Sequence, residues 1–128
     1  MRAAVTLDVN LEAPYRARRW LEELQMPLGT DRADVVELLV AELVTASVKH
    51  AMREGRRGID IALSAERGVV RIEVSYPARR SVPDVPDVPD EETGFGFYLV
   101  DKLADRWGVR GGPDPGLWFE LDVYSLGG

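Results

Sequence analysis

Residues 31–53 read DRADVVELLVAELVTASVKHAMR, and this stretch decides the fold. Asp31 is a suitable N-cap for a helix over residues 32–53, and Gly55 just beyond is a typical helix stop. At 100° per residue, the valines and leucines spread over almost the whole circumference of this helix. The pattern therefore predicts a long helix that is buried on several sides.

The same helix carries one polar stripe deep within it, made of Glu42, Thr45 and Lys49, with Ala46 adjoining. A charged carboxylate in such an apolar helix is costly unless it is paired or lies in a hydrated pocket. Functional sites use carboxylates of this kind, and so do structural ion pairs. Glu42 is therefore a candidate site residue, or else a partner of Lys49 or of an arginine.

The other elements surround this helix in an order that indicates the fold class. Alternating apolar and polar residues predict a strand over residues 5–11, and Pro14 opens a helix over residues 14–25. Further along we expect strands at 58–64 and 68–75, joined by a turn at 65–68. An amphipathic helix should follow from Thr93 to a stop at Gly108, and then strands at 109–110 and 117–124. We expect Trp107 and Trp118 to lie in the core. This order predicts an α+β fold, with one mixed or antiparallel sheet and helices on one face.

The composition fits one domain over residues 1–128 and removes several classes of site. The chain is 45% hydrophobic and 30% charged, which is typical of a globular domain with one core. With no cysteine and one histidine, we expect no disulfide, no thiolate zinc site and no multi-histidine metal centre. The sequence shows neither a secretory signal nor an apolar run near the about 20 residues of a transmembrane helix. We expect a cytoplasmic protein with no membrane partner.

Negative charge dominates the chain, and its densest part is a proline-rich loop. A net charge of −6 without a sustained basic face predicts no nucleic-acid partner. Val-Pro-Asp occurs three times within an acidic loop of about residues 77–93. Its prolines favour an extended polyproline II segment with Asp84, Asp87 and Asp90 along one edge. The loop is either a solvated, stiffened lid or a docking strip for a basic partner surface.

Four segments of the chain resemble one family in order and spacing. Residues 42–51, ELVTASVKHA, are similar to the N-box helix of the anti-sigma-factor serine kinases, a branch of the GHKL (histidine-kinase-like) ATPase superfamily. Residues 69–77 resemble the strand into the G1 box, residues 94–109 the second glycine box with its helix, and residues 117–121 the closing strand. The resemblance implies a two-layer Bergerat-type sandwich, with a mixed, mostly antiparallel sheet covered by about three helices. It also implies a pocket for ATP and Mg²⁺, a sigma factor as partner, and phosphorylation of a serine on an antagonist protein.

The sequence departs from this family pattern where ATP and Mg²⁺ would be held. Ala46 replaces an asparagine that helps to hold Mg²⁺ in the family, and a methyl group has no lone pair. Tyr76 stands where the family has an aspartate that accepts the adenine amino group, and residues 114–116 replace a phosphate-contacting Gly-Lys-Thr segment. Glu42, at the family's general-base position, is retained. These losses predict a pseudokinase that binds ATP weakly or not at all, with no active catalytic residue and no cofactor.

Three functions follow from these observations, and the first is the one we favour. It is a regulatory protein-binding module whose partner is a sigma factor, an anti-sigma antagonist-type protein or a second copy of the chain. The second is an active serine kinase that uses ATP and Mg²⁺, and the third is a sensor of a non-nucleotide small molecule. Phe95 either anchors a partner or packs into the cleft. The degenerate nucleotide pocket is expected to comprise Glu42, Ala46, Lys49, Tyr76, Gly94, Gly96 and Gly116, the glycines of the second box serving either backbone shape or phosphate binding.

Overall fold

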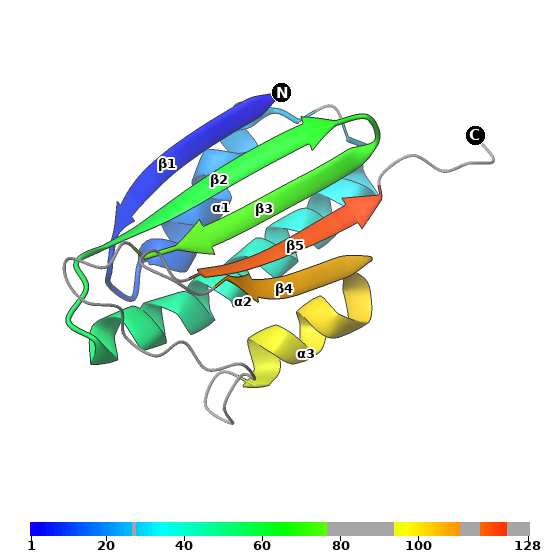
Figure 1. The fold of residues 1–128 in the computed structure, drawn as a ribbon. Helices are drawn as coiled ribbons and strands as arrows, with labels where there is room; N and C mark the ends of the chain where they lie inside the picture. The colour runs from blue at the N-terminus through cyan, green and yellow to red at the C-terminus, as the bar shows by residue number, and fades with distance from the viewer. Residues whose placement is uncertain (27, 77–93, 111–115, 123–128) are drawn as a thin grey trace.

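The computed structural model describes residues 1–26, 28–76, 94–110 and 116–122. In this part of the chain a five-stranded sheet forms one layer, and three helices lie against one of its faces (Figure 1). The α+β sandwich expected from the sequence is confirmed. No helix among these residues is both long enough and apolar enough to cross a membrane.

The strands are β1 (Arg2–Asp8), β2 (Gly58–Glu66), β3 (Val69–Ser75), β4 (Arg106–Arg110) and β5 (Gly116–Asp122). They lie in the order β1-β2-β3-β5-β4, and each neighbouring pair is antiparallel. β2 and β3 form a hairpin whose turn residues, Arg67 and Gly68, have φ of 54° and 79°. Positive φ at both positions gives a tight hairpin turn, so the turn expected here is confirmed.

The helices are α1 (Ala13–Leu24), α2 (Thr30–Arg53) and α3 (Gly94–Leu103). α2 contacts both other helices and also β2, β3 and β5 (Figure 1). Val36, Val40 and Val44 are fully buried. These contacts confirm that the long apolar helix is covered on several sides.

The prediction made from the sequence is wrong at the start of α2 and correct at its end. Gly29 is the N-cap, and Asp31 lies inside the first turn, so the prediction of Asp31 as N-cap is wrong. Near the other end, Gly55 has a φ of 71°, and the Arg56 N–H donates to the Ala51 carbonyl at 2.8 Å. This is the hydrogen bond of a glycine-terminated helix end, and it reverses the chain toward β2.

The first strand lies three residues earlier than the sequence pattern suggests. The pairing between β1 and β2 ends at Asp8 and Gly58, and the Val9 N–H then donates to the Arg57 carbonyl at 2.9 Å. The next residues turn into α1, with the Glu12 N–H donating to the Asn10 side-chain oxygen at 2.9 Å. This turn uses residues that the alternation had assigned to the strand.

Gly108 does not end a helix, because α3 ends at Leu103 and Gly108 lies inside β4. A Cβ atom on Gly108 would lie 2.8 Å from the indole ring of Trp118 on β5. Glycine therefore serves cross-strand packing here. Trp118 alternates with the buried Leu117 and Phe119 along β5, so it lies on the face of the sheet that the helices do not cover (the open face). It is only partly buried there, so the prediction that it belongs to the core is wrong.

Candidate functional site

α2 carries three of the expected pocket positions at helical spacing. Glu42, Ala46 and Lys49 are separated by four and three residues, so they lie along one side of the helix. Ala46 is buried, with 3% of its surface exposed, whereas Glu42 is partly buried and Lys49 is exposed. At the position where the resemblance implies a metal-holding amide, the chain therefore presents a buried methyl group.

The two hydroxyl groups beside Ala46 are already used within the helix. The Thr45 hydroxyl donates to the Ala41 carbonyl at 2.7 Å, and the Ser47 hydroxyl donates to the Leu43 carbonyl at 2.8 Å. Ser47 is also fully buried. Bonds of this kind hold the side chain against the preceding turn of its own helix. Neither hydroxyl is aimed along the Ala46 side of α2.

Tyr76 directly follows β3 and is buried, with 3% of its surface exposed. Burial, and to a smaller extent the nearby Glu54 carboxylate, raise the pKa of its phenol to about 12, with Arg56 opposing the shift. The phenol therefore stays protonated at physiological pH. Its large ring belongs to the hydrophobic core cluster beneath the sheet.

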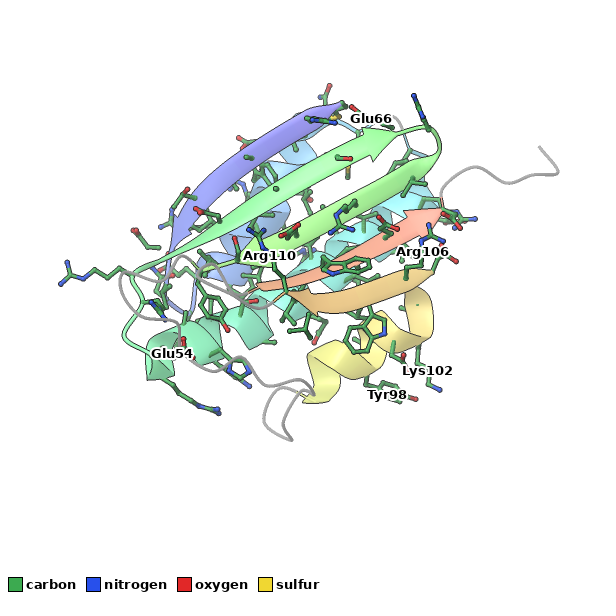
Figure 2. All side chains as sticks on the ribbon, viewed as in Figure 1. Glu54, Glu66, Tyr98, Lys102, Arg106 and Arg110 are labelled. Carbon is green, nitrogen blue, oxygen red and sulfur yellow. The ribbon has the colours of Figure 1, made fainter. Side chains whose placement is uncertain are left out.

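The neighbours of Tyr76, Glu54 and Arg56, were missed in the sequence. They form an ion pair with 3.3 Å between an Arg56 guanidinium nitrogen and a Glu54 carboxylate oxygen, and the Arg56 side chain is only 9% exposed. Figure 2 shows Glu54 at the end of α2. The reversal at Gly55 was a usable signal, because it folds the following residues back onto the end of the helix.

The glycines of the expected pocket occupy the ends of two elements. Gly116 is the first residue of β5 and pairs with Ser75, the residue before Tyr76. A Cβ atom there would lie 2.5 Å from the Val74 carbonyl oxygen, so the close approach of the two strands requires glycine. Gly94 and Gly96 lie in the first turn of α3. The structure thus brings Gly116 and Tyr76 together at one end of the sheet.

A comparison with known families identifies the chain. Residues 7–117 match the model of the histidine kinase-like ATPase domain. The chain belongs to this family. The matched residues include Glu42, Ala46, Tyr76 and both glycines of the second box, so the resemblance drawn from the four segments is confirmed at the level of the family.

One solved structure shares this histidine kinase-like fold over nearly the whole chain. The crystal structure of the RsbU and RsbW domains of Rv1364c from Mycobacterium tuberculosis matches with a TM-score of 0.62 and 15% identity, over 96% of this chain. The chain spans only 32% of that longer protein chain. A likeness at this identity establishes the fold. A comparison with curated proteins gave no match.

In this histidine kinase-like domain, the retained Glu42 lies apart from Tyr76, in a groove of about 360 Å³. Burial raises the pKa of the neighbouring Glu37, Glu22 raises it further, and Arg18 opposes the shift from 3.8 Å away. Within the described residues, Glu42 itself takes part in no ion pair. The groove is lined by Arg18, Asp34, Glu37, Leu38, Ala41 and Glu42.

Several predicted site residues lie outside the described part of the chain. Asp84, Asp87 and Asp90, with the whole acidic loop, belong to this group, as does the side chain of Phe95. Their proposed roles in partner binding therefore stay predictions. Among the described residues, no three His, Cys, Asp or Glu side chains are grouped as metal ligands would be.

Proposed function

We propose that this histidine kinase-like domain is a regulatory protein-binding module, similar to an anti-sigma factor, that binds ATP weakly or not at all and has no kinase activity. The observation that carries the proposal is the pair of buried side chains Ala46 and Tyr76, which stand at the two positions where the resemblance implies contacts to Mg²⁺ and adenine.

Ala46 argues against a magnesium site on α2. Mg²⁺ takes oxygen ligands in a near-octahedral arrangement, and the Ala46 methyl supplies none. The adjacent Thr45 and Ser47 hydroxyls donate to carbonyls of their own helix, and Ser47 is fully buried. An active kinase would need one of these hydroxyls as a replacement ligand, and their positions do not favour that role.

Tyr76 argues against an adenine site beside β3. A protonated phenol with a pKa of about 12 is a poor substitute for a carboxylate that accepts the adenine amino group. Its ring is itself buried in the core, where a purine would need space. A hydrogen bond to a charged group contributes about 1.5–3 kcal/mol, so losing the adenine and metal contacts weakens ATP binding by a few orders of magnitude.

The expected partners are a sigma factor or an anti-sigma antagonist-type protein. The resemblance of residues 42–51 to an anti-sigma N-box helix supports this class, and so does the fold shared with a protein that contains an RsbW domain. The acidic loop with Asp84, Asp87 and Asp90 is the proposed docking strip, with Phe95 as a neighbouring anchor. The domain therefore acts by binding proteins, without a cofactor or a nucleic acid.

Isothermal titration with ATP and Mg²⁺ tests the proposal. We expect no binding by the wild-type protein tighter than about 1 mM, because both contacts are missing. The double variant Ala46→Asn and Tyr76→Asp restores the family residues, and we expect it to gain measurable affinity while each single variant gains less. Circular dichroism verifies that each variant is folded. Micromolar binding by the wild type would overturn the proposal.

The retained Glu42 favours one second candidate, an active serine kinase with a variant pocket. Transfer of radiolabelled phosphate from ATP to an antagonist-type protein distinguishes the two functions. We expect no transfer. If transfer occurs and Glu42→Gln abolishes it, the chain is an active kinase and the pseudokinase proposal is wrong.

A further inference from the structure

Among the described residues, the two most exposed large apolar side chains lie one helical turn apart. Leu11, just before α1, is 85% exposed, and Tyr15 in the first turn of α1 is 60% exposed. The Ala13 N–H donates to the Asn10 carbonyl at 3.2 Å, so the chain already turns toward the helix at Leu11. Arg19 follows one turn after Tyr15 and is also exposed. Residues four apart are neighbours on a helix surface, so Leu11, Tyr15 and Arg19 form one row, which we call the α1 ridge.

Arg19 differs from the other arginines of α1 because it forms no ion pair within the described residues. Arg16 lies 3.0 Å from a glutamate one turn earlier, and Arg18 lies 3.8 Å from Glu37 on α2. The Arg19 guanidinium instead lies over the Tyr15 ring, 5.9 Å from its centroid, and donates to the Tyr15 hydroxyl at 3.3 Å. Tyrosine and arginine are the residue types most enriched among the strongly contributing residues of protein interfaces, together with tryptophan.

The order of charges along α1 does not stabilise the helix. Its first turn contains no acidic residue and its last turn contains no basic one. The arginines instead come first, and Glu22 and Glu23 follow them. The helix dipole favours the reverse order, with acidic residues near the start and basic residues near the end. Neither the helix dipole nor an ion pair therefore accounts for the position of Arg19.

Two other exposed apolar side chains have surroundings of a different charge. Leu38 is 42% exposed and lies in the groove that three carboxylates of α2 line. Tyr98 on α3 is 59% exposed and pairs with Lys102, whose ammonium lies 5.6 Å from the ring centroid (Figure 2). Asp101, next to that lysine, is exposed and offsets its charge. An acidic molecule would be repelled at Leu38 and would meet no net positive charge at Tyr98.

We propose that the α1 ridge is the docking surface for an acidic segment of a partner protein. The segment places an apolar side chain against Leu11 and Tyr15, and a carboxylate on the Arg19 guanidinium, which can hold it through two parallel hydrogen bonds. The excess negative charge of the chain lies in residues 81–128, so residues 1–80, which include α1, are close to neutral. The inference rests on the proposed protein-binding function, and it adds a surface whose charge is opposite to that of the acidic loop.

A synthetic acidic peptide tests this surface. The probe is a fluorescein-labelled peptide of glutamates with two leucines four residues apart, and its control has glutamine in place of every glutamate. We expect the acidic peptide to bind the wild-type protein with a Kd of roughly 100 µM or below, and the glutamine peptide to bind at least about tenfold more weakly. Fluorescence anisotropy measures both. Added salt should weaken the binding of the acidic peptide.

Substitutions on the α1 ridge locate the binding. We expect Arg19→Glu to weaken binding of the acidic peptide roughly tenfold or more, because it places like charges together, and Tyr15→Ala to do so through the lost apolar contact. Arg19→Lys keeps the charge but loses the paired hydrogen bonds, so we expect an intermediate loss. Tyr98→Ala is the matched control, because it removes an equally exposed tyrosine that pairs with a cation one turn later. We expect it to bind as wild type.

Two results would overturn the proposal. One is no binding of the acidic peptide at roughly 1 mM, and the other is a loss for Tyr98→Ala as large as the loss for Tyr15→Ala. The substituted side chains are all exposed, and circular dichroism verifies that the variants are folded. ATP binding by the wild-type protein would contradict the proposed loss of kinase function without affecting this surface, so the two proposals fail separately.

Discussion

The two faces of β3 and β5 are made from alternate residues of the same strands, yet they are stabilised by different forces. On the face covered by the helices, Ile72 and Phe119 lie opposite each other and are fully buried. On the open face, one residue along, Arg71 lies opposite Glu120 with 3.0 Å between a guanidinium nitrogen and a carboxylate oxygen. The Arg71 guanidinium also lies over the Trp118 ring, 4.3 Å from its centroid.

Further ion pairs on the open face join β4 to β5 and to β3. Arg106 on β4 contacts both Glu120 and Asp122, and Arg110 reaches across β5 to Glu73 on β3. Figure 2 shows Arg106 and Arg110 at the two ends of β4. Exposed ion pairs contribute little to stability, whereas buried apolar side chains contribute several kcal/mol. The covered face therefore holds the fold, and the open face makes it sensitive to pH.

Removing a side chain from the covered face should have the largest effect. We expect Phe119→Ala to lower the free energy of unfolding by about 3–5 kcal/mol, because a fully buried ring is replaced by a cavity. Urea denaturation followed by circular dichroism measures the loss.

Trp118→Ala is the matched control, because Trp118 is the adjacent aromatic residue on the open face of the same strand. We expect it to cost less than half as much, since its ring is only partly buried and contacts Arg71 and Gly108. Equal losses for the two variants would contradict the distinction between the faces.

A methyl group added to the open face should have a smaller effect. Gly108→Ala places a Cβ atom 2.8 Å from the Trp118 indole, and we expect it to lower the free energy of unfolding by about 1–3 kcal/mol. The same substitution in a Trp118→Leu background should cost clearly less, because the clashing ring is gone. If Gly108→Ala costs the same in both backgrounds, the indole contact is not its cause.

Local patterns in the sequence predicted the elements better than they predicted their exact positions. α2 and the β2–β3 hairpin were predicted because the apolar run of α2, the glycine stop at Gly55 and the turn at residues 65–68 are local signals. The shift of β1 was not predicted, because the position where a strand ends depends on its partner residue, which is Gly58 here. The role of Gly108 could not be predicted for the same reason, since it depends on Trp118 in another strand.

The candidate site was predictable as a set of positions but not as an arrangement. The N-box spacing identified Glu42 and Ala46, and the end of β3 identified Tyr76. That Tyr76 is buried near the Glu54–Arg56 pair, while Glu42 lines a separate groove, depends on how α2 packs against its neighbours. Such packing joins residues far apart in the chain, and no local pattern records it.

The smallest effect, and the one most specific to the open face, is a dependence of stability on pH. Hydrogen bonds from Arg106 hold the pKa values of Glu120 and Asp122 below their ordinary range. Carboxyl groups with a lowered pKa stabilise the folded state above their ordinary pKa of about 4, and this contribution is lost as the pH falls through the lowered values. We therefore expect Arg106→Gln to lower the melting temperature slightly at pH 7, and the difference from wild type to shrink steadily below about pH 4. Thermal melts of both proteins between pH 7 and pH 3 measure this convergence, with Arg57→Gln as a control at an arginine whose side chain forms no ion pair within the described residues. A difference that stays constant over this range would mean that Arg106 acts by packing and not through its charge.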